Sequence, residues 1–494
     1  MYCRCRFKKD PRIKVKFLEE NFGISGNTNE AITQASGDYI GFLDHDDELA
    51  PFALYEVVRY INNHRSVRLL YSDEDKLYEN NIRSDPFFKP DWAPDHFLSQ
   101  NYICHFLVIE KDVLAKTGKL RKEFDGSQDY DLILRLTELI KASEIGHIQK
   151  ILYHWRVLPT STSYSIQAKP SAMVSSKNAI QETLTRRKIE AEVENGIIQD
   201  TYRVKYTIRG KPLISIIIPT KDHAEDLRKC IQSIVLKSTY DHYEIIIIDN
   251  DSHDPETLSL FSELKNDCRI RIIEYPHEFN FSGINNYAVG FANGELLLFL
   301  NNDTEVISQE WLSTMLEHAQ RQEVGAVGAK LLYRDGTIQH AGVILGIGDT
   351  NSAVAGHSHK YACAGSPGYF SSLNIIRNYS AVTAACLMTR REVFDEVGGF
   401  DENLGVAFND VELCLKIRTK NYLIVYTPYA ELFHTESKSR GYDDTPEKTR
   451  RIQSEVRYIR SKWDMEIDKG DPYYNRNLSR IKEDFSLNFQ EMTI

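Results

Sequence analysis

The chain has 494 residues, too many for one ordinary domain, so we expect two or three domains, each large enough to bury its own core. Its 42% hydrophobic and 27% charged residues are typical of a globular protein, and its net charge of −11 argues against a nucleic-acid partner, whose phosphates attract basic surfaces. The eight cysteines are scattered without a CxxC pair, and we find neither a signal-peptide pattern nor an apolar run of the ~20 residues that span a bilayer, so we expect a reduced cytoplasmic compartment and no zinc site.

A short strand followed by acids is the first predicted element. Residues 37–51 read GDYIGFLDHDDELAP, in which apolar residues bounded by turn residues predict a buried strand. Four carboxylates follow it: Asp44, Asp46, Asp47 and Glu48. They repel one another unless a cation lies among them, so the cluster predicts a cation site; a solvated turn is the alternative.

The chain then repeats itself. Residues 12–48 align without a gap with residues 269–305, so that Asp46 falls on Asp303, and residues 123–135 resemble residues 403–416. So long a period indicates two tandem domains and not a solenoid. The second copy opens with PLISIIIPTKD and EIIIIDNDS, whose continuous β-branched runs predict parallel strands covered on both faces. The first copy has no counterpart of this opening, so we expect its fold to be incomplete.

These patterns predict four regions. Residues 1–165 form a truncated first domain, residues 166–210 a linker with a helix over 171–193 and a short strand, residues 211–440 a complete second domain, and residues 441–494 a carboxyl-terminal helix and tail.

The motifs ISIIIPTKDH, IIIIDNDS, FLNNDTEV, NDVELCLK and FHTESKSRG resemble those of bacterial family 2 glycosyltransferases of the GT-A fold. In the first copy, DHDDELAP, YSDEDK and PFFKPDW resemble the companion domain of two-domain members that build cell-surface polysaccharides. The resemblance implies an α/β protein of tandem GT-A domains, the first incomplete. It implies an inverting hexosyl- or deoxyhexosyltransferase of O-antigen- or capsule-like synthesis.

The resemblance also implies the partners. These are a UDP- or dTDP-linked sugar donor, a saccharide or lipid-linked saccharide acceptor, and Mn²⁺ or Mg²⁺ as cofactor. It leaves room for a peripheral contact with the inner membrane face. Two other functions stay open: a non-catalytic assembly or acceptor-binding protein with degenerate domains, and a GT-A-like nucleotidyltransferase. The second is disfavoured because PTKDHAEDLRK lacks the glycines of a phosphate-binding loop.

Ligands of open parallel sheets bind beyond the carboxyl ends of the strands, which predicts a donor pocket at two such ends. Its predicted residues are Pro219, Thr220, Asp249 and Asn250. Asp249 and Ser252 would alternatively only cap turns. By resemblance, Asn301 is an amide hydrogen-bonder for the sugar or ribose. The metal ligands implied are Asp303 and His434, and Lys438 and Arg440 would contact the diphosphate.

The resemblance puts the catalytic base at Asp410, near the start of a helix. We predict Asp410 and Glu412 together as the catalytic residues: two positions apart on a helix they point to different faces, so one acid can face the pocket while the other braces it. Helix capping alone is the alternative interpretation. A vestigial first site is implied at Asp44, Asp46, Asp129 and His154. Tyr369, Phe370 and His340 would line an acceptor groove or pack in the core, with equal weight.

Overall fold

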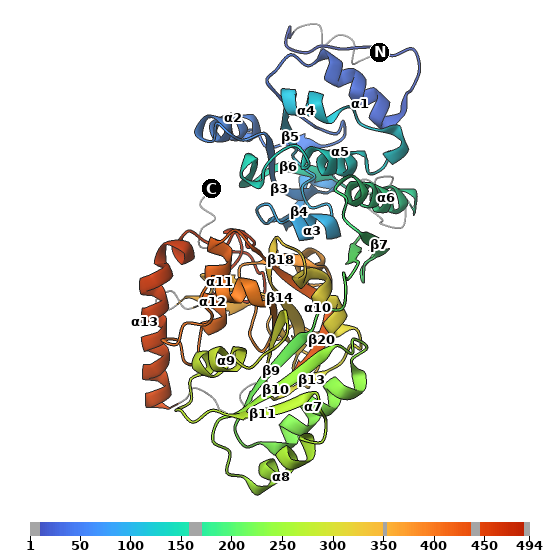
Figure 1. The fold of residues 1–494 in the computed structure, drawn as a ribbon. Coiled ribbons are helices and arrows are strands. Elements are labelled where there is room, and N and C mark those ends of the chain that lie inside the picture. The colour runs from blue at the N-terminus through green and yellow to red at the C-terminus, as the bar shows by residue number, and fades with distance from the viewer. Residues whose placement is uncertain (1–9, 158–169, 349–352, 436–444, 489–494) are drawn as a thin grey trace. The chain divides into compact units, whose positions relative to one another are not determined.

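The computed structural model describes residues 10–157, 170–348, 353–435 and 445–488. The chain divides into two compact units (Figure 1). The first comprises Met1–Trp92 and Asn101–Asn195, and the second comprises Ala93–Gln100 and Gly196–Ile494.

The first unit is built on one mixed sheet with strand order β1-β5-β3-β6-β2, in which β4 also pairs with β3. Its strands are β1 (Tyr39–Gly41), β2 (Glu48–Leu49), β3 (Leu69–Leu77), β4 (Arg83–Phe87), β5 (Val108–Glu110) and β6 (Ile145–Arg156), and β7 (Ala191–Asn195) follows them in the chain. Its α-helices are α1 (Gly23–Gln34), α2 (Ala53–Asn63), α4 (Lys111–Thr117), α5 (Gln128–Leu136) and α6 (Pro170–Arg186). Its 3-10 turns are η3 (Glu79–Asn81), η4 (Lys122–Phe124) and η5 (Ala142–Glu144). The strand predicted within residues 37–51 is confirmed as β1, but it is not a buried strand: β1 is an edge strand of this sheet, and of its three residues only Ile40 is buried.

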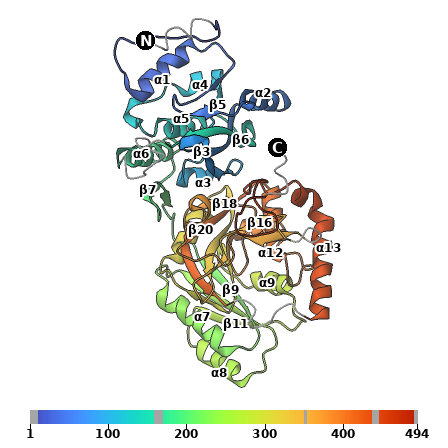
Figure 2. The ribbon, with the colours of Figure 1, turned by 180° about the vertical axis from the view of Figure 1, so that it is seen from behind.

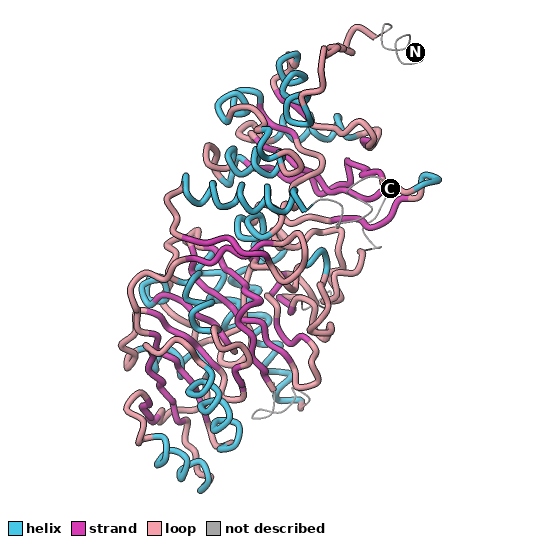
Figure 3. The backbone as a smooth tube through the Cα atoms, turned by 90° about the vertical axis from the view of Figure 1, so that its right-hand side faces the viewer, coloured by secondary structure: helices cyan, strands magenta, loops and turns pink. Residues whose placement is uncertain are grey.

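The second unit is built on a larger mixed sheet, of order β11-β10-β9-β12-β19-β14-β20-β13 with β15 and β18 beside this path. Figure 3 shows these strands running through the unit with helices around them. The strands are β8 (Tyr202–Tyr206), β9 (Ile214–Thr220), β10 (Tyr243–Asp249), β11 (Ile270–Glu274), β12 (Leu296–Leu300), β13 (Thr304–Val306), β14 (Val324–Leu332), β15 (Ile338–His340), β16 (Val343–Leu345), β17 (Ala355–His357), β18 (Arg377–Tyr379), β19 (Cys386–Arg390) and β20 (Leu423–His434). The helices are α3 (Pro94–Ser99), α7 (Ala224–Lys237), α8 (Pro255–Leu264), α9 (Phe281–Val289), α10 (Trp311–Ala319), α11 (Arg391–Glu396), α12 (Asn409–Thr419) and α13 (Pro446–Asp468), with the 3-10 turn η7 (Tyr369–Ser371).

Strands β9, β10, β11 and β12 pair in parallel, as their β-branched runs predicted. Both faces of the sheet are covered, because successive side chains alternate between two apolar cores. One core holds Ile216 and Ile218 of β9 with side chains of α7, α8 and α10, and the other holds Ile217 with side chains of α9, α12 and α13. Helices α9, α12 and α13 accordingly lie on the same side of the unit in both views (Figures 1 and 2).

The two copies of the repeat differ at one edge of the sheet. In the second unit β12 pairs with β9, and β11 and β10 lie beyond it. In the described part of the first unit, no strand pairs with the corresponding edge of β1. Residues 13–17, which align with β11, form no strand, and Ile13 and Val15 are 46% and 53% exposed. The described first domain is therefore a shorter version of the second, as the repeat predicted.

The linker helix ends earlier than residue 193. Helix α6 stops at Arg186, where Lys188 adopts the left-handed conformation (φ 56°), and residues 191–195 form β7. The amide of Gln181 holds this strand, since its Nε2 donates to the Ala191 carbonyl and its Oε1 accepts from the Val193 N–H. Helix α6 itself packs against α5 within the first unit.

A short piece of the first half of the sequence folds into the second unit. Helix α3 presents Asp95, which is 2% exposed and forms an ion pair with Arg321 (2.5 Å) and a hydrogen bond with the Asn378 amide (2.7 Å). No sequence pattern indicates this insertion, because α3 is short and its partners lie more than two hundred residues further along the chain.

Candidate active site

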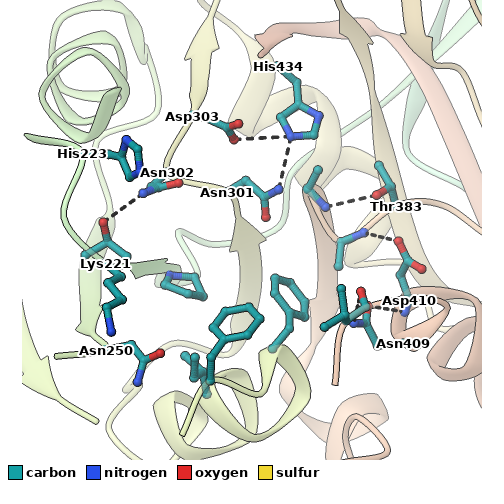
Figure 4. A pocket seen from close by; sticks show the side chains of 18 of the residues that line it. Lys221, His223, Asn250, Asn301, Asn302, Asp303, Thr383, Asn409, Asp410 and His434 are labelled. Atoms are coloured by element: carbon teal, nitrogen blue, oxygen red, sulfur yellow. Dashed lines mark hydrogen bonds and ion pairs between the residues drawn. The ribbon is translucent and has the colours of Figure 1, made fainter. Parts of the chain in front are cut away.

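A cavity of about 560 Å³ opens in the second unit where β9, β10 and β12 end. Carboxyl ends of parallel strands meet at one edge of a sheet, which explains why segments so distant in sequence share this cavity. Figure 4 shows three groups of side chains around it: Lys221 and Asn250 on one wall, Asp303 with His434 on a second, and Asp410 with Thr383 on a third.

The first wall is formed by the end of β9 and the loop that follows it. Pro219 and Thr220 line the cavity, and the Asn302 amide donates to the Thr220 hydroxyl (2.9 Å). Asp222 has a positive φ of 53° and accepts from the backbone N–H groups of His253 and Asp254, both at 2.8 Å. These hydrogen bonds lower the Asp222 pKa and tie this loop to the one after β10.

The two residues at the end of β10 have different roles. Asn250 lines the cavity and donates to the His277 carbonyl (2.9 Å). Asp249 is 8% exposed, lies outside the cavity lining, and accepts from the Ser252 N–H (3.1 Å). Asp249 thus caps the turn, as the alternative to a donor-binding role predicted. Asn250 is the member of the pair that faces the cavity.

The second wall holds the predicted metal ligands. Thr304 of β13 lies opposite His434 of β20, and this pairing brings Asp303 to the same place. Asp303 Oδ1 lies 3.4 Å from His434 Nε2, and the Asn301 amide donates to the same ring nitrogen (3.2 Å). Asp303 and His434 are only 8% and 5% exposed.

This donor set fits a hard divalent ion. Mg²⁺ and Mn²⁺ prefer oxygen ligands, and Mg²⁺ typically takes one or two carboxylates together with substrate phosphates. His434 Nδ1 is buried without a hydrogen-bond partner, so the polar contacts given above for the ring are both at Nε2. Within the described residues no group of three His, Cys, Asp or Glu side chains could hold a metal, so the remaining ligands would come from the substrate and water. The predicted diphosphate contacts Lys438 and Arg440 lie outside the described residues.

The third wall is formed by the start of α12. Asp410 Oδ2 accepts from the Ala384 N–H (3.1 Å) and its Oδ1 from the Val411 N–H (2.9 Å). Burial raises the pKa of Asp410, because desolvation disfavours the charged carboxylate more than these donors favour it. Asp410 lines the cavity (Figure 4), and its raised pKa makes the carboxylate a stronger base than an exposed aspartate.

Glu412 turns away from the cavity. It is fully buried and pairs with the Lys462 ammonium of α13 (2.5 Å) and with Lys416 (3.2 Å). Two residues along a helix face different ways, so Glu412 fastens α12 to α13 while Asp410 faces the cavity. Of the two acids predicted as catalytic, only Asp410 can reach a ligand there.

His340 does not line the cavity but stabilises its third wall by a hydrogen bond. It is fully buried outside the cavity lining, and its Nε2 accepts from the Thr383 N–H (3.2 Å) while its Nδ1 donates to the Ala329 carbonyl (2.9 Å). Burial lowers its pKa to about 4, so the ring is neutral and acts as an acceptor for the segment that holds Asp410. Tyr369 and Phe370 also lie outside this cavity lining; the Tyr369 ring stacks near Phe485 (5.6 Å). The groove role considered for these three residues therefore has no support at this cavity.

Several lining residues were not among the predicted site residues. They are Lys221, His223, Phe279, Phe281, Gln339, His357 and Thr383. Lys221 and His223 lie within the motif ISIIIPTKDH, which was the available signal for these two. Gln339 and His357 come from β15 and β17, which reach the cavity only through tertiary packing.

In the first unit the four predicted residues are separately engaged. His154 Nδ1 lies 2.6 Å from Asp75 Oδ1, and Asp129 Oδ2 accepts from the Cys104 thiol (2.7 Å).

Asp44 and Asp46, the other two residues of this predicted site, make hydrogen bonds through their own backbone atoms. The Asp44 N–H donates to the Tyr153 hydroxyl (3.3 Å), and the Asp46 carbonyl accepts from Arg156 Nε (2.6 Å). Within the described residues, no hydrogen bond or ion pair joins any two of Asp44, Asp46, Asp129 and His154. The counterpart of the Asp303–His434 pair is therefore not formed there.

Sheet, cavity and site together define an α/β protein of tandem GT-A domains, of which the described first is the shorter. The family model described as "Glycosyl transferase family 2" matches residues 2–118 and 215–398. The chain belongs to glycosyl transferase family 2. Among the helices of the described ranges, none combines the length and apolar character needed to cross a bilayer.

Two curated relatives match nearly the whole chain. An uncharacterised protein, y4gI, of Sinorhizobium fredii is 45% identical over 97% of this chain and 52% of its own length. The O-antigen biosynthesis protein RfbC of Myxococcus xanthus is 41% identical over 97% of this chain and 37% of its own length. The chain thus spans about half the length of these relatives or less.

Among solved structures, a mannosyltransferase of Pyrobaculum calidifontis in complex with GDP-Man and Mn²⁺ is similar over 51% of this chain and 65% of its own. The TM-score is 0.37 and the sequence identity 17%.

Proposed function

We propose that the second unit is an inverting, metal-dependent glycosyltransferase. It moves a hexosyl or deoxyhexosyl group from a UDP- or dTDP-linked sugar to a saccharide or lipid-linked saccharide acceptor of a cell-surface polysaccharide. The observation that carries this proposal is that Asp410 and the Asp303–His434 pair line one cavity beyond the ends of β9 and β10. The name of the Myxococcus xanthus relative, an O-antigen biosynthesis protein, supports the class of product.

The chemistry assigned to Asp410 is that of a general base. Its carboxylate takes the proton of an acceptor hydroxyl as that oxygen forms a bond to the anomeric carbon. The bond from that carbon to the diphosphate breaks in the same displacement, the electron pair leaves with the nucleoside diphosphate, and the carbon inverts. The raised pKa of Asp410 favours this role, because a base closer to neutral holds the abstracted proton better.

The loops after β9 and β10 would hold the nucleotide. Thr220 and Asn250 supply polar contacts on that wall, and Asn301 lies between it and the metal ligands. Asp303 and His434 would hold Mn²⁺ or Mg²⁺, which when bound neutralises negative charge on the departing diphosphate.

The first unit, by this proposal, contributes little catalysis. A carboxylate pair without a bound diphosphate holds a divalent ion weakly, and Asp44 and Asp46 have no nucleotide wall beside them among the described residues. We assign residues 1–165 the role of a scaffold with a vestigial site.

The test is to incubate the purified protein with a panel of UDP- and dTDP-sugars and Mn²⁺ and to identify the released product. We expect a nucleoside diphosphate, and a chelator such as EDTA should stop its release. Released pyrophosphate would instead indicate a nucleotidyltransferase. Saccharide binding without release from any donor would indicate a non-catalytic assembly protein. Asp241→Asn, a change at an exposed residue far from the cavity lining, serves as the control variant.

A further inference from the structure

Two polar side chains on the cavity wall have no role in the chemistry assigned so far. Gln339 lies on β15 and His357 on β17, and both line the cavity shared by Asp303, Asp410 and His434. Gln339 is 2% exposed, although it is an uncharged polar residue between two fully buried neighbours. The residues proposed to bind the nucleotide and the metal lie on other elements, and so does Asp410, the proposed general base.

Both side chains carry a buried polar atom without a partner. Gln339 Oε1 and His357 Nδ1 make no hydrogen bond in the structure. Leaving a buried acceptor or donor unpaired costs free energy, and folded proteins pair nearly all such groups. Two polar atoms without hydrogen-bond partners on the wall of a substrate cavity therefore indicate that a bound ligand supplies those partners.

The fold holds both groups in place. Strand β15 pairs with β14, with His340 opposite Leu331, and β17 pairs with β16, with His357 opposite Val343. The His357 N–H donates to Glu483 Oε1 (2.6 Å), and its ring packs edge-on against that of His340 (5.5 Å between centroids). Sites built on strands position their polar groups more accurately than sites on mobile loops.

The chemistry of the missing ligand follows from these atoms. An amide oxygen accepts a hydrogen bond, and an uncharged imidazole nitrogen either accepts or donates one. Burial keeps the His357 ring uncharged by lowering its pKa well below the usual value. A hydroxyl group both donates and accepts, and a sugar ring offers several hydroxyls in fixed directions.

We propose that Gln339 and His357 form a subsite that binds hydroxyl groups of a sugar ring in the cavity and thereby selects the saccharide. This inference rests on the proposed glycosyl transfer. The sugar is either the transferred group of the donor or the terminal ring of the acceptor. Both offer the same hydroxyl chemistry, and the experiment separates them.

The main variant is Gln339→Met, which keeps the length of the side chain and removes its polar atoms. The matched control is Gln320→Met, because Gln320 Oε1 accepts from the Arg209 N–H (2.9 Å) and Gln320 lies outside the cavity lining. His357→Phe is the second variant, since a phenyl ring preserves the packing on His340 but has no Nδ1.

The probes are UDP and dTDP, the hexose derivatives of each, and p-nitrophenyl glycosides as acceptors, all with Mn²⁺. Binding of the nucleoside diphosphate alone should not change in Gln339→Met. The KM for the sugar nucleotide, measured by release into water, should rise roughly tenfold if the subsite holds the transferred sugar. If it holds the acceptor, that KM should stay the same while the KM for the glycoside rises by a similar factor.

Thermal unfolding separates this role from a structural one. Gln339→Met removes an unpaired buried atom, so its Tm should equal or exceed that of the wild type. Gln320→Met removes a half-buried amide that has hydrogen-bond partners, so its Tm should fall while both KM values stay unchanged. A lower Tm in Gln339→Met with unchanged KM values would overturn the proposal, as would equal loss of affinity for the nucleoside diphosphate and its sugar derivative.

The two proposals fail in different ways. If the wild-type protein binds and turns over none of the donors, the proposed function fails, and this subsite fails with it. If the wild type transfers sugar and both Gln339→Met and His357→Phe match it in every KM, only the subsite proposal fails.

Discussion

Replacement of the proposed base is the sharpest test of the active site. In Asp410→Asn the amide keeps one oxygen, which can accept from either the Ala384 N–H or the Val411 N–H, but not from both in the present geometry. One backbone donor thus loses its acceptor, at about 1 kcal/mol. The same change removes a carboxylate whose charged form is disfavoured by burial, which offsets that loss. We therefore expect the free energy of unfolding to change by no more than about 1 kcal/mol.

The effect on turnover should be far larger. An amide cannot take the acceptor proton, and a positioned base typically contributes about 10²–10⁴-fold to the rate. That factor corresponds to roughly 3–5 kcal/mol in the activation free energy. Affinity for the nucleoside diphosphate should not change, because Asp410 lies on a different wall from Thr220 and Asn250 (Figure 4).

The pH dependence gives a second readout. Because the folded-state pKa of Asp410 is raised, wild-type turnover should fall on the acid side at a higher pH than an exposed aspartate would produce. A carboxyl whose folded pKa exceeds its unfolded value destabilises the fold as pH rises through that range. The stability of Asp410→Asn relative to the wild type should therefore improve with rising pH.

The assay is release of nucleoside diphosphate, with urea unfolding and titration of the nucleoside diphosphate on the same preparations. Asp241→Asn is the matched control, since Asp241 is exposed and forms an ion pair with the exposed Lys211. Turnover of Asp410→Asn within a few-fold of the wild type would refute the assignment of the base. Loss of nucleotide binding together with turnover would show that the residue acts through the shape of the site.

Four further outcomes are expected. Asp303→Ala should weaken sugar-nucleotide binding mainly when Mn²⁺ is present, as calorimetry with and without the ion would show; equal weakening in both would indicate a structural role. Asp44→Asn combined with Asp46→Asn should leave product formation within a few-fold of the wild type, and a large loss would make the first unit a working site. Glu412→Ala should lower the free energy of unfolding, measured in urea, by about 3 kcal/mol, because it leaves the Lys462 charge without its buried partner. A loss near zero would contradict a stabilising Glu412–Lys462 ion pair. His340 has a folded pKa of about 4, so its contribution to stability is full above pH ~6.5 and falls by about 3 kcal/mol by pH 4; His340→Gln should flatten that slope in acid unfolding.

The sequence alone was enough to identify the fold class, the repeat and the family. β-Branched runs predicted the parallel strands because strands covered on both faces must be apolar throughout. The roles predicted for Asp303 and Asp410 came from the resemblance, whose motifs keep their order in the chain, and both residues stand where polar side chains interrupt an apolar pattern, at the end of a buried strand and near the start of a helix.

Only the tertiary structure showed which side chain faces the cavity at the end of a strand or the start of a helix. Asn250 and not Asp249 faces the cavity, and Asp410 and not Glu412 does so, because neighbouring positions point to different sides and only packing fixes which side is the cavity. His154 was predicted as the counterpart of His434 in the first unit, yet its ring contacts Asp75 there.

The insertion of α3 into the second unit and the wall made by Gln339 and His357 were also decided only by the tertiary structure. Gln339 sits between buried residues on a strand, where its pattern resembles that of a core position. A buried polar atom is recognised as a binding group only when its partners can be counted, and that count depends on which distant segments surround it. The sequence determined which elements form, and long-range packing determined which side chains share the cavity.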